Sequence, residues 1–412
     1  MSHTAYAGVD VSQADLVVTL LDAQGQPLLS HLKRPNHIAG AREIADRLAQ
    51  EAQAHGCTRL RLGLEATHVY WLPAALLWHD FTWPQDLEVE IGGLNPHAIK
   101  AFRDSLDADR EKTDDLDAEA IALHLMVPCH RLSPPLPDPY LAWQRLTRTR
   151  FTLARQLGAE KTRALGWLWL LASDYTTHPP FSDLFGTAAQ DLLLHFDFPE
   201  AVTNLAPQEL STFLQQHSRN HFPDPDGKAA QVQAALHTAY PLSPEFRQAL
   251  RFVLRHTLQH LASLENLLQH FDQRIAQAVG DADRPLRSIP GLGPVLAAGL
   301  LAELGPPDRF PTEAAVARYA GLWWPRAQSG PVSAEDRRLS KAGNTYLRYY
   351  LIQAADRVRH HIPAYQQFYA DKYRTARTHK HKRALVLTAR KLVRLIVALL
   401  KSQQEFRMPD PN

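Results

Sequence analysis

The chain has 412 residues, 45% of them hydrophobic, and its formal net charge at pH 7 is only +2. Because one hydrophobic core seldom serves a chain of this length, we expect two or three domains, and the hydrophobic content excludes a disordered protein. The small net charge excludes a uniformly basic protein, so any binding of nucleic acid must depend on a local cluster of positive charge.

The N-terminal residues and the cysteines indicate the cellular compartment in which we expect the protein. The sequence begins without a basic segment followed by a long apolar one, so we expect no signal peptide, and its apolar runs are too short to span a bilayer. Cys57 and Cys129 belong to no CxxC pair, so neither zinc-finger spacing nor a disulfide framework is expected. We therefore expect a protein of a reducing cytoplasm, without contact to a membrane.

Residues 1–135 are predicted to form an α/β domain. Period-two and β-rich patterns predict strands at 5–12, 15–22, 28–34, 59–65 and 87–93. Helical spacing predicts helices near 38–55 and 69–80, and a last helix that begins within the acidic stretch "REKTDDLDAEAIALHL" at 110–125. The order β-β-β-α-β-α-β-α is that of the ribonuclease H-like fold, an α/β architecture with a mixed sheet.

Residues 136–283 are predicted to be a helical linker and coiled-coil region. The proline-rich segment "VPCHRLSPPLPDP" at 127–139 marks the domain boundary. Long helical patterns follow at 140–172 and 245–279, and the second of these could pair in a coiled coil. Between them, residues 173–245 contain many prolines and are read as short helices and loops.

Residues 284–412 are predicted to form a mostly helical domain with two features that suit nucleic acid. The segment "SIPGLGPVLAAGLLAELG" resembles a helix-hairpin-helix, in which Gly291 and Gly293 permit a turn whose N–H groups face a phosphate. An ordinary helix turn is the alternative. From Arg357 to Lys401 there are twelve Lys and Arg residues against one acid, Asp371. This is the charge pattern of a phosphate-binding surface, although a solvated helix face would look the same.

Four acidic residues are candidates for a metal site. Asp10 lies inside an apolar strand, where an unpaired carboxylate is costly, and Glu65 ends a second strand. Asp114 and Asp117 are three residues apart, so a helix places both on one face, whereas Asp115 and Glu119 point elsewhere. Acids at a helix start could also simply favour the helix dipole.

The fold would bring these four carboxylates together. In a ribonuclease H-like sheet the first and fourth strands are neighbours, and the last helix packs against them. A cluster of oxygen ligands suits Mg²⁺ or Mn²⁺ rather than zinc, and such sites can stabilise both the entering and the leaving oxygen of a phosphoryl transfer. Lys112, just before the acidic pair, is a candidate phosphate contact, or merely a surface lysine.

Several stretches resemble motifs of one family, the transposases of the bacterial insertion-sequence family "one-ten". They are "YAGVDVSQADLVVTLLD", "LGLEATHVYWLPAALL" and "NPHAIKAFRDSLDADREKTDDLDAEAIA", followed by "IPGLGPVLAAGLLAELG", "RFPTEAAVARYAGLWWPRAQSG" and "LSKAGNTYLRYYLIQAA". The resemblance covers about residues 5–127 and 284–357 in the correct order. It does not extend to the middle of the chain.

The resemblance implies an enzyme with two catalytic parts. One is a RuvC-like domain whose tetrad Asp10, Glu65, Asp114 and Asp117 binds Mg²⁺. The other is a C-terminal transposase domain in which Ser329, before Gly330, attacks DNA. A serine hydroxyl needs activation by a base or a metal, and a site shared between protomers could supply it. The implied protein is a DEDD recombinase of the bacterial cytoplasm.

The resemblance also implies the partners of this recombinase. These are double-stranded donor and target DNA, a structured non-coding bridge RNA, and further copies of the chain in a dimer to tetramer. We further expect nucleic-acid contacts at Lys112, Gly291, Gly293, Arg326, Lys341, Arg348, Lys380, Lys382 and Arg383.

Two other functions remain open at this point. A metal-dependent, structure-selective nuclease such as a Holliday-junction resolvase shares the carboxylate cluster but needs no nucleophilic serine. A non-catalytic nucleic-acid binder from a decayed element needs neither, although all four acids and the serine are present here.

Overall fold

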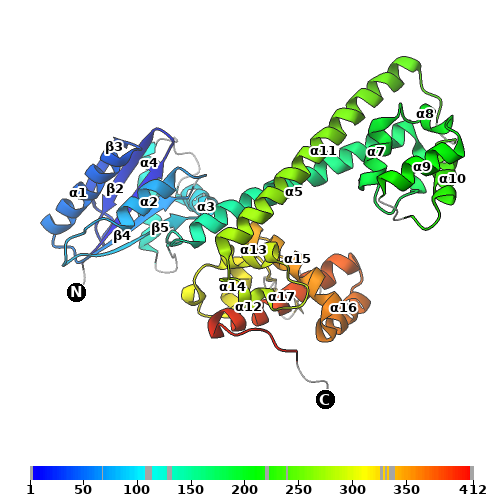
Figure 1. The fold of residues 1–412 in the computed structure, drawn as a ribbon. Helices are drawn as coiled ribbons and strands as arrows, with labels where there is room; N and C mark the ends of the chain where they lie inside the picture. The colour runs from blue at the N-terminus through cyan, green and yellow to red at the C-terminus, as the bar shows by residue number, and fades with distance from the viewer. Residues whose placement is uncertain are drawn as a thin grey trace. The chain divides into compact units, whose positions relative to one another are not determined.

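The computed structural model describes residues 3–66, 68–106, 114–127, 132–218, 222–237, 240–324, 328–329, 332–333 and 339–408. Its contacts divide the chain into two units, Met1–Pro137 and Asp138–Asn412. The first unit contains the large sheet and the second consists mainly of helices (Figure 1). We expected boundaries near residues 135 and 283. The contacts place the first at Pro137, and the second falls inside the helical unit.

The first unit is built on a mixed five-stranded sheet with the strand order β3-β2-β1-β4-β5. The strands are β1 (Thr4–Val11), β2 (Asp15–Leu21), β3 (Pro27–Pro35), β4 (Arg59–Glu65) and β5 (Glu88–Leu94). The pairs β3-β2 and β2-β1 are antiparallel, whereas β1-β4 and β4-β5 are parallel. The predicted mixed α/β architecture is confirmed, and it fits a ribonuclease H-like domain.

The two faces of this sheet are covered by different helices. Alternate residues of β1, such as Val9, join a hydrophobic core with α1 (Ile38–Ala54) and α2 (Trp71–His79). The opposite face packs against α4 (Asp114–Met126), which contacts β1, β2 and β4. A further helix, α3 (Pro96–Leu106), precedes α4 and packs on it. The sequence prediction placed no helix there, so the true order ends in β-α-α.

The second unit begins with two long helices that pack along each other in opposite directions. They are α5 (Tyr140–Leu171) and α11 (Pro244–Val279). Two ion pairs join them along their contact: Arg150 Nε lies 2.8 Å from Asp272 Oδ1, and Lys161 Nζ lies 2.9 Å from Glu265 Oε1. The two predicted long helices therefore form and pack against each other within this chain, and a coiled coil in the strict sense stays a prediction.

Short helices fill the segment between α5 and α11, as predicted. They share a hydrophobic core with the end of α5 and the start of α11. The short helices are α6 (Ser173–Thr177), α7 (Thr187–His195), α8 (Glu200–Thr203), α9 (Pro207–His217) and α10 (Pro225–Leu236).

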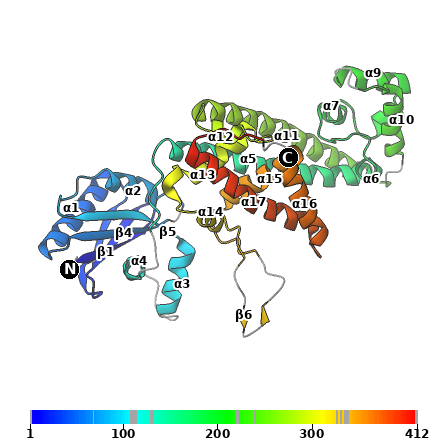
Figure 2. The same ribbon diagram turned by 90° about the horizontal axis from the view of Figure 1, so that it is seen from below.

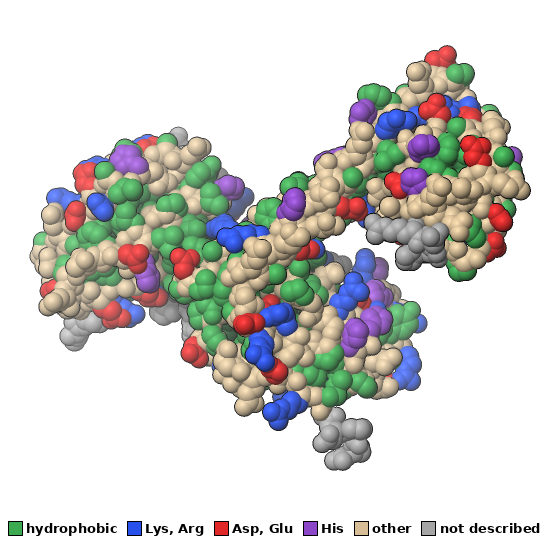
Figure 3. Space-filling view, viewed as in Figure 1, with side chains coloured by type: hydrophobic (Ala, Val, Ile, Leu, Met, Phe, Trp, Pro, Cys, Tyr) green, Lys and Arg blue, Asp and Glu red, His purple; other side chains and the backbone are tan. Residues whose placement is uncertain are grey.

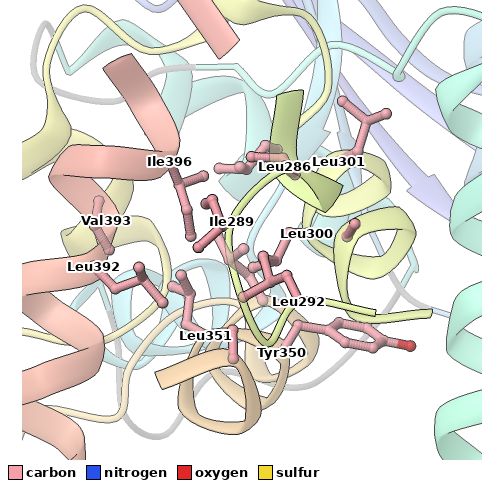
Figure 4. Close-up of a cluster of buried hydrophobic side chains, with 14 of the residues drawn as sticks. Leu286, Ile289, Leu292, Leu300, Leu301, Tyr350, Leu351, Leu392, Val393 and Ile396 are labelled. Carbon is pink, nitrogen blue, oxygen red and sulfur yellow. The ribbon is translucent and has the colours of Figure 1, made fainter. Parts of the chain in front are cut away.

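The remainder of the second unit is a helical domain packed around α13 (Pro294–Leu304). The other elements are α12 (Arg284–Arg287), the 3₁₀ helix η1 (Pro307–Arg309), α14 (Glu313–Tyr319), the short strands β6 (Gln328–Ser329) and β7 (Val332–Ser333), α15 (Thr345–His361), α16 (Pro363–Thr375) and α17 (Lys380–Ser402). Figure 4 shows the core, in which Leu300 of α13 meets Leu351 of α15 and Ile396 of α17. Among the described residues, no helix combines the length and the apolar character that crossing a bilayer requires.

Candidate active site and nucleic-acid interface

Asp10 and Glu65 lie next to each other on one face of the sheet. Val9 of β1 pairs with Leu64 of the parallel strand β4, so Asp10 and Glu65 both follow one residue later. Neighbouring strands are about 4.8 Å apart, and side chains two residues apart point to the same face. Gly8 faces α4, so Asp10, two positions later, faces α4 as well.

A row of glycines explains why α4 lies so close to this face. Gly8, Gly63 and Gly92 occupy the same register on β1, β4 and β5. A Cβ on Gly8 would lie 2.1 Å from the carbonyl oxygen of Ala118 in α4, and one on Gly92 would lie 2.8 Å from the backbone of Ser133. The missing side chain at Gly8 therefore lets the backbone of α4 rest almost directly on β1, while Gly63 makes room for the side chain of Leu125 and Gly92 for the segment at Ser133.

Asp117 extends from the first turns of α4 and is buried, with 5% of its surface exposed. Its Oδ1 accepts a hydrogen bond from the guanidinium of Arg103, at the end of α3. The pKa of Arg103 is raised, chiefly by this hydrogen bond and also by the charges of Asp117, Glu65 and Asp104. Because Glu65 acts on the same guanidinium, Asp117 and the end of β4 belong to one electrostatic cluster.

Asp114 is the first residue of α4, but its side chain lies outside the described residues, as does that of Asp115. Among the side chains that are described, no three His, Cys, Asp or Glu residues are grouped as a metal site would require. The tetrad therefore remains a prediction, with the backbone placing Asp114 one turn before Asp117.

The chemistry of the described donors fits a divalent cation. Asp10 and Glu65 offer carboxylate oxygens from adjacent strands, and Asp117 offers a third carboxylate from the helix on the same face, although these three are not gathered closely enough in this structure to form a metal site by themselves. Oxygen donors of this kind suit Mg²⁺ or Mn²⁺. Like charges on neighbouring strands destabilise a sheet, so the cluster requires positive charge nearby, which Arg103 supplies in part.

Replacing Gly8 with alanine is expected to destabilise the first unit and to remove its activity. The new Cβ would clash with the carbonyl oxygen of Ala118 and lie 2.4 Å from the amide nitrogen of Ala122. Backbone atoms cannot yield as a flexible side chain does, so we expect a loss of about 1–3 kcal/mol or more in the free energy of unfolding. Urea denaturation followed by circular dichroism measures this loss.

Gly158→Ala is the control for this substitution. A Cβ at that position in α5 would meet nothing within 4 Å, so the change should raise stability slightly through helix propensity. Equal stability of Gly8→Ala and the unaltered protein would contradict the close packing of α4 on β1.

Ser329 lies in the short strand β6, between α14 and α15. Its backbone pairs with Val332 of β7, and Gln328 pairs with Ser333. Figure 2 shows β6 on the segment that leaves the helices after α14. The side chain of Ser329 lies outside the described residues, so its base or metal partner is not identified.

The two ends of the segment that contains Ser329 are fastened together. The amide of Ser340 donates to the carbonyl of Trp323 at 3.0 Å, and the amide of Asn344 donates to the carbonyl of Tyr319 at 2.6 Å. Arg348 of α15 donates to the carbonyls of Ala320 at 3.1 Å and of Lys341 at 2.8 Å. Ser329 therefore lies in a segment, residues 320–343, whose two ends are held together by hydrogen bonds. We call this segment the serine loop and its two ends the base of the loop.

A buried ionic network next to the base of this loop was not predicted from the sequence. Glu303 of α13 is fully buried, and Arg148 of α5 donates to both its carboxylate oxygens, at 2.7 and 2.9 Å. Asn344, which caps α15, donates to Glu303 Oε2 at 2.6 Å and to the hydroxyl of Tyr319 at 3.0 Å. The network thus joins α5 and α13 to both ends of the serine loop. The helical spacing of apolar residues in these segments does not indicate which of their charged residues are buried.

The residues expected to contact nucleic acid have different surroundings. Gly291 packs closely on α15, because a Cβ there would lie 2.6 Å from the ring of His361, whereas Gly293 opens to free space at the start of α13. Close packing on α15 therefore explains the glycine at position 291. For Gly293, the predicted phosphate contact stays a prediction. Lys112 and Arg326 lie outside the described residues.

Lys341 and Arg348 both lie at the base of the serine loop. Lys341 is exposed with a left-handed backbone, φ 55°. Arg348 is half-buried, and burial lowers its pKa. Because its guanidinium already bonds two backbone carbonyls, its surroundings favour a role in holding the loop over one in gripping a phosphate.

Lys380, Lys382 and Arg383 occupy the first turn of α17, the first two exposed and Arg383 half-buried. Figure 3 shows Lys, Arg and His side chains gathered over α16 and α17 on the face in view. Part of the basic segment from Arg357 to Lys401 therefore lies at the surface of the helical domain.

Comparison with known proteins identifies the family. The family described as Transposase IS116/IS110/IS902 matches residues 283–370, and the DEDD transposase family of IS110 matches residues 7–171. Together the two matches span more than half of the chain. The first runs from α12 into α16 and includes Ser329, and the second runs from within β1 to the end of α5 and includes the four carboxylates.

Relatives from Streptomyces agree with these matches. A candidate transposase of the IS117 mini-circle of Streptomyces coelicolor is 25% identical over 84% of this chain and 81% of its own length. An uncharacterized 43.6 kDa protein of insertion element IS110, from the same organism, is 35% identical over 30% of each chain. An uncharacterized 44.8 kDa protein of insertion element IS116 from Streptomyces clavuligerus is 26% identical over 53% of this chain and 54% of its own. With the mixed sheet, its carboxylates and the helical C-terminal domain, these matches show that the chain belongs to the IS110 family of transposases.

Proposed function

We propose that this transposase cuts and rejoins donor and target DNA through a covalent phosphoserine link at Ser329, with the carboxylates of the first unit as its metal site. The observation that carries the proposal is the placement of Asp10, Glu65 and Asp117 on one side of the sheet. Membership of a DEDD transposase family supports DNA as the substrate.

The proposed chemistry is a pair of transesterifications. The Oγ of Ser329 attacks a phosphorus atom of the DNA backbone, forms a phosphoserine ester and releases one strand end as a hydroxyl. A hydroxyl of the other DNA then attacks the same phosphorus and releases the serine. Each step exchanges one phosphate ester for another, and no ester is hydrolysed. Cutting and rejoining therefore need no external energy source.

Mg²⁺ or Mn²⁺ would be held by Asp10, Glu65, Asp114 and Asp117. When bound, such an ion stabilises the negative charge on the oxygens of the phosphate. The chain's own residues prepare this site. Gly8 lets α4 approach β1, and the guanidinium of Arg103 balances the charge of Asp117.

The partners of the proposed reaction are two DNA duplexes, a structured bridge RNA and further copies of the chain. Base pairing by the RNA would select the sites, while the protein recognises the shape and backbone of the RNA. Lys112, Gly293, Arg326, Lys341, Lys380, Lys382 and Arg383 are proposed to contact nucleic acid. A dimer to tetramer would allow Ser329 of one copy to meet the carboxylates of another.

Removing RNA from the purified protein is expected to abolish recombination between specific sites. Site choice by base pairing requires the RNA, whereas the protein alone binds backbone with little sequence preference. The measurement is recombination of a plasmid pair bearing element ends and target, before and after treatment with an RNA-specific nuclease. Adding back the RNA that co-purifies should restore the product. Undiminished site-specific recombination after treatment would refute the guide RNA and leave the serine chemistry standing.

A metal-dependent, structure-selective nuclease remains the alternative function. It would use the same carboxylates but release cut strands without a covalent protein–DNA intermediate. The position of Ser329 within the region matched by the Transposase IS116/IS110/IS902 family favours the recombinase.

A further inference from the structure

The corner between α16 and α17 combines dense positive charge with almost no acid. Residues 372–383, "KYRTARTHKHKR", contain six Lys and Arg residues and no acidic one. The adjacent acid, Asp371, already accepts hydrogen bonds from the guanidinium of Arg374 and, at 2.9 Å, from Gln367. The surface therefore carries a net positive charge that an anionic polymer could neutralise.

Two tyrosines stand among these cations, one helical turn apart on α16. The ring centroids of Tyr369 and Tyr373 are 6.0 Å apart and their planes are inclined by 36°. Tyr373 is 42% exposed, and the ammonium of Lys380 lies 6.0 Å from its ring centre. An aromatic side chain with this exposure is accessible to a ligand that the cations attract.

The ring of Tyr369 is held in place from two sides. Its hydroxyl lies 2.7 Å from Nδ1 of His381 in α17, and the guanidinium of Arg359 lies 4.3 Å from its ring centre. These contacts link α15, α16 and α17, so the orientation of Tyr369 is set by the fold. A platform that is ordered beforehand loses little side-chain entropy on binding.

We infer that this surface, formed by Tyr369, Tyr373, Lys380, His381 and Lys382, binds single-stranded nucleic acid by stacking a base on the exposed Tyr373, which the half-buried Tyr369 supports. Aromatic rings beside a basic track are how proteins bind single strands without sequence preference. In a duplex the base faces are already stacked on each other and are not accessible to a surface ring. The tyrosines thus add affinity for unpaired strands only, whereas the lysines attract any nucleic acid.

The inference deepens the proposed function and rests on it for the kind of ligand. Recombination guided by base pairing exposes unpaired DNA and RNA strands, and both share the phosphates and base faces that this surface would contact. Which of the two is bound depends on the sugar, so separate DNA and RNA probes are needed.

Binding of short labelled oligothymidylate, oligouridylate and a mixed-sequence duplex to the intact protein tests the inference by fluorescence anisotropy. Changing both Tyr369 and Tyr373 to alanine should weaken single-strand binding by about 5- to 150-fold through the loss of one stack. Duplex binding should change less than twofold. The two tyrosine-to-phenylalanine changes should retain single-strand binding, because phenylalanine still stacks.

Charge variants separate attraction from stacking. Lys380→Gln with Lys382→Gln should weaken single-strand and duplex binding alike and lower the salt dependence by about 0.7 for each lost single-strand contact. Tyr240→Ala, an exposed tyrosine elsewhere in the same unit, is the control and should change nothing. Tighter binding of oligouridylate identifies RNA as the ligand, and tighter binding of oligothymidylate identifies DNA.

The inference is overturned if the alanine variant binds single strands as well as the unaltered protein, or loses duplex binding equally. Should the double variant unfold on a thermal melt, the exposed Tyr373→Ala variant alone decides. Adduct formation at Ser329 is scored on the same preparations. An adduct without tyrosine-dependent binding refutes only this surface, and tyrosine-dependent binding without an adduct refutes only the serine chemistry.

Discussion

Replacing Ser329 with alanine is expected to abolish the covalent protein–DNA adduct on donor and target oligonucleotides. The hydroxyl is the proposed nucleophile, and alanine has no atom that can form the phosphate ester. Loss of a serine nucleophile can reduce turnover by about 10⁶, so a fall of at least about a thousandfold is expected here. Denaturing electrophoresis of end-labelled oligonucleotides after incubation with Mg²⁺ measures the adduct.

Ser333→Ala is the matched control for this experiment. Ser333 pairs with Gln328 in the same two-stranded sheet as Ser329, so the substitution perturbs the same element and leaves the proposed nucleophile in place. Normal adduct formation is expected for it. An adduct that persists in Ser329→Ala would remove the serine from the mechanism, and cleavage without any adduct in both variants would favour the nuclease.

The sheet and its carboxylates could be predicted because a strand repeats every two residues. That period, with the order of the elements, is enough to place Asp10 and Glu65 on neighbouring strands and on one face. The register also aligns Gly8 with Gly63, but a glycine in a strand does not reveal what approaches it. The close contact with α4 became visible only from the packed backbone.

Contacts between distant segments could not be predicted in this way. Arg103 is 14 residues from Asp117, and Arg148 is 155 residues from Glu303. The spacing of apolar residues predicts each of these helices without the ion pair. The residues next to Asp117 or Glu303 in the sequence therefore do not show that its carboxylate is buried. The basic tail was predicted by composition alone, yet the pairing of Tyr369 with His381 depends on how α16 turns into α17.

Asparagine in place of Asp10 is expected to remove cleavage while leaving the fold intact. The amide keeps the size of the side chain but removes the negative charge, so a bound Mg²⁺ loses a ligand of the type it prefers. We expect at least about a hundredfold loss of cleavage in Mg²⁺, as for the loss of other groups that stabilise transition-state charge. Oligonucleotide cleavage measures the loss, and partial recovery in Mn²⁺ would support direct ligation of a metal.

Stability measurements distinguish this metal role from a structural one. Asp10 and Glu65 are neighbours of like charge, so without divalent ions Asp10→Asn should be as stable as the unaltered protein or more stable, by up to about 1 kcal/mol. With Mg²⁺ at about ten times its dissociation constant, the unaltered protein should gain about 1.4 kcal/mol and the variant almost nothing. Glu119→Gln, on the same helix α4, should behave like the unaltered protein. If Asp10→Asn is instead destabilised without metal and responds normally to Mg²⁺, Asp10 serves the fold and the proposed site must be sought among the other acids of α4.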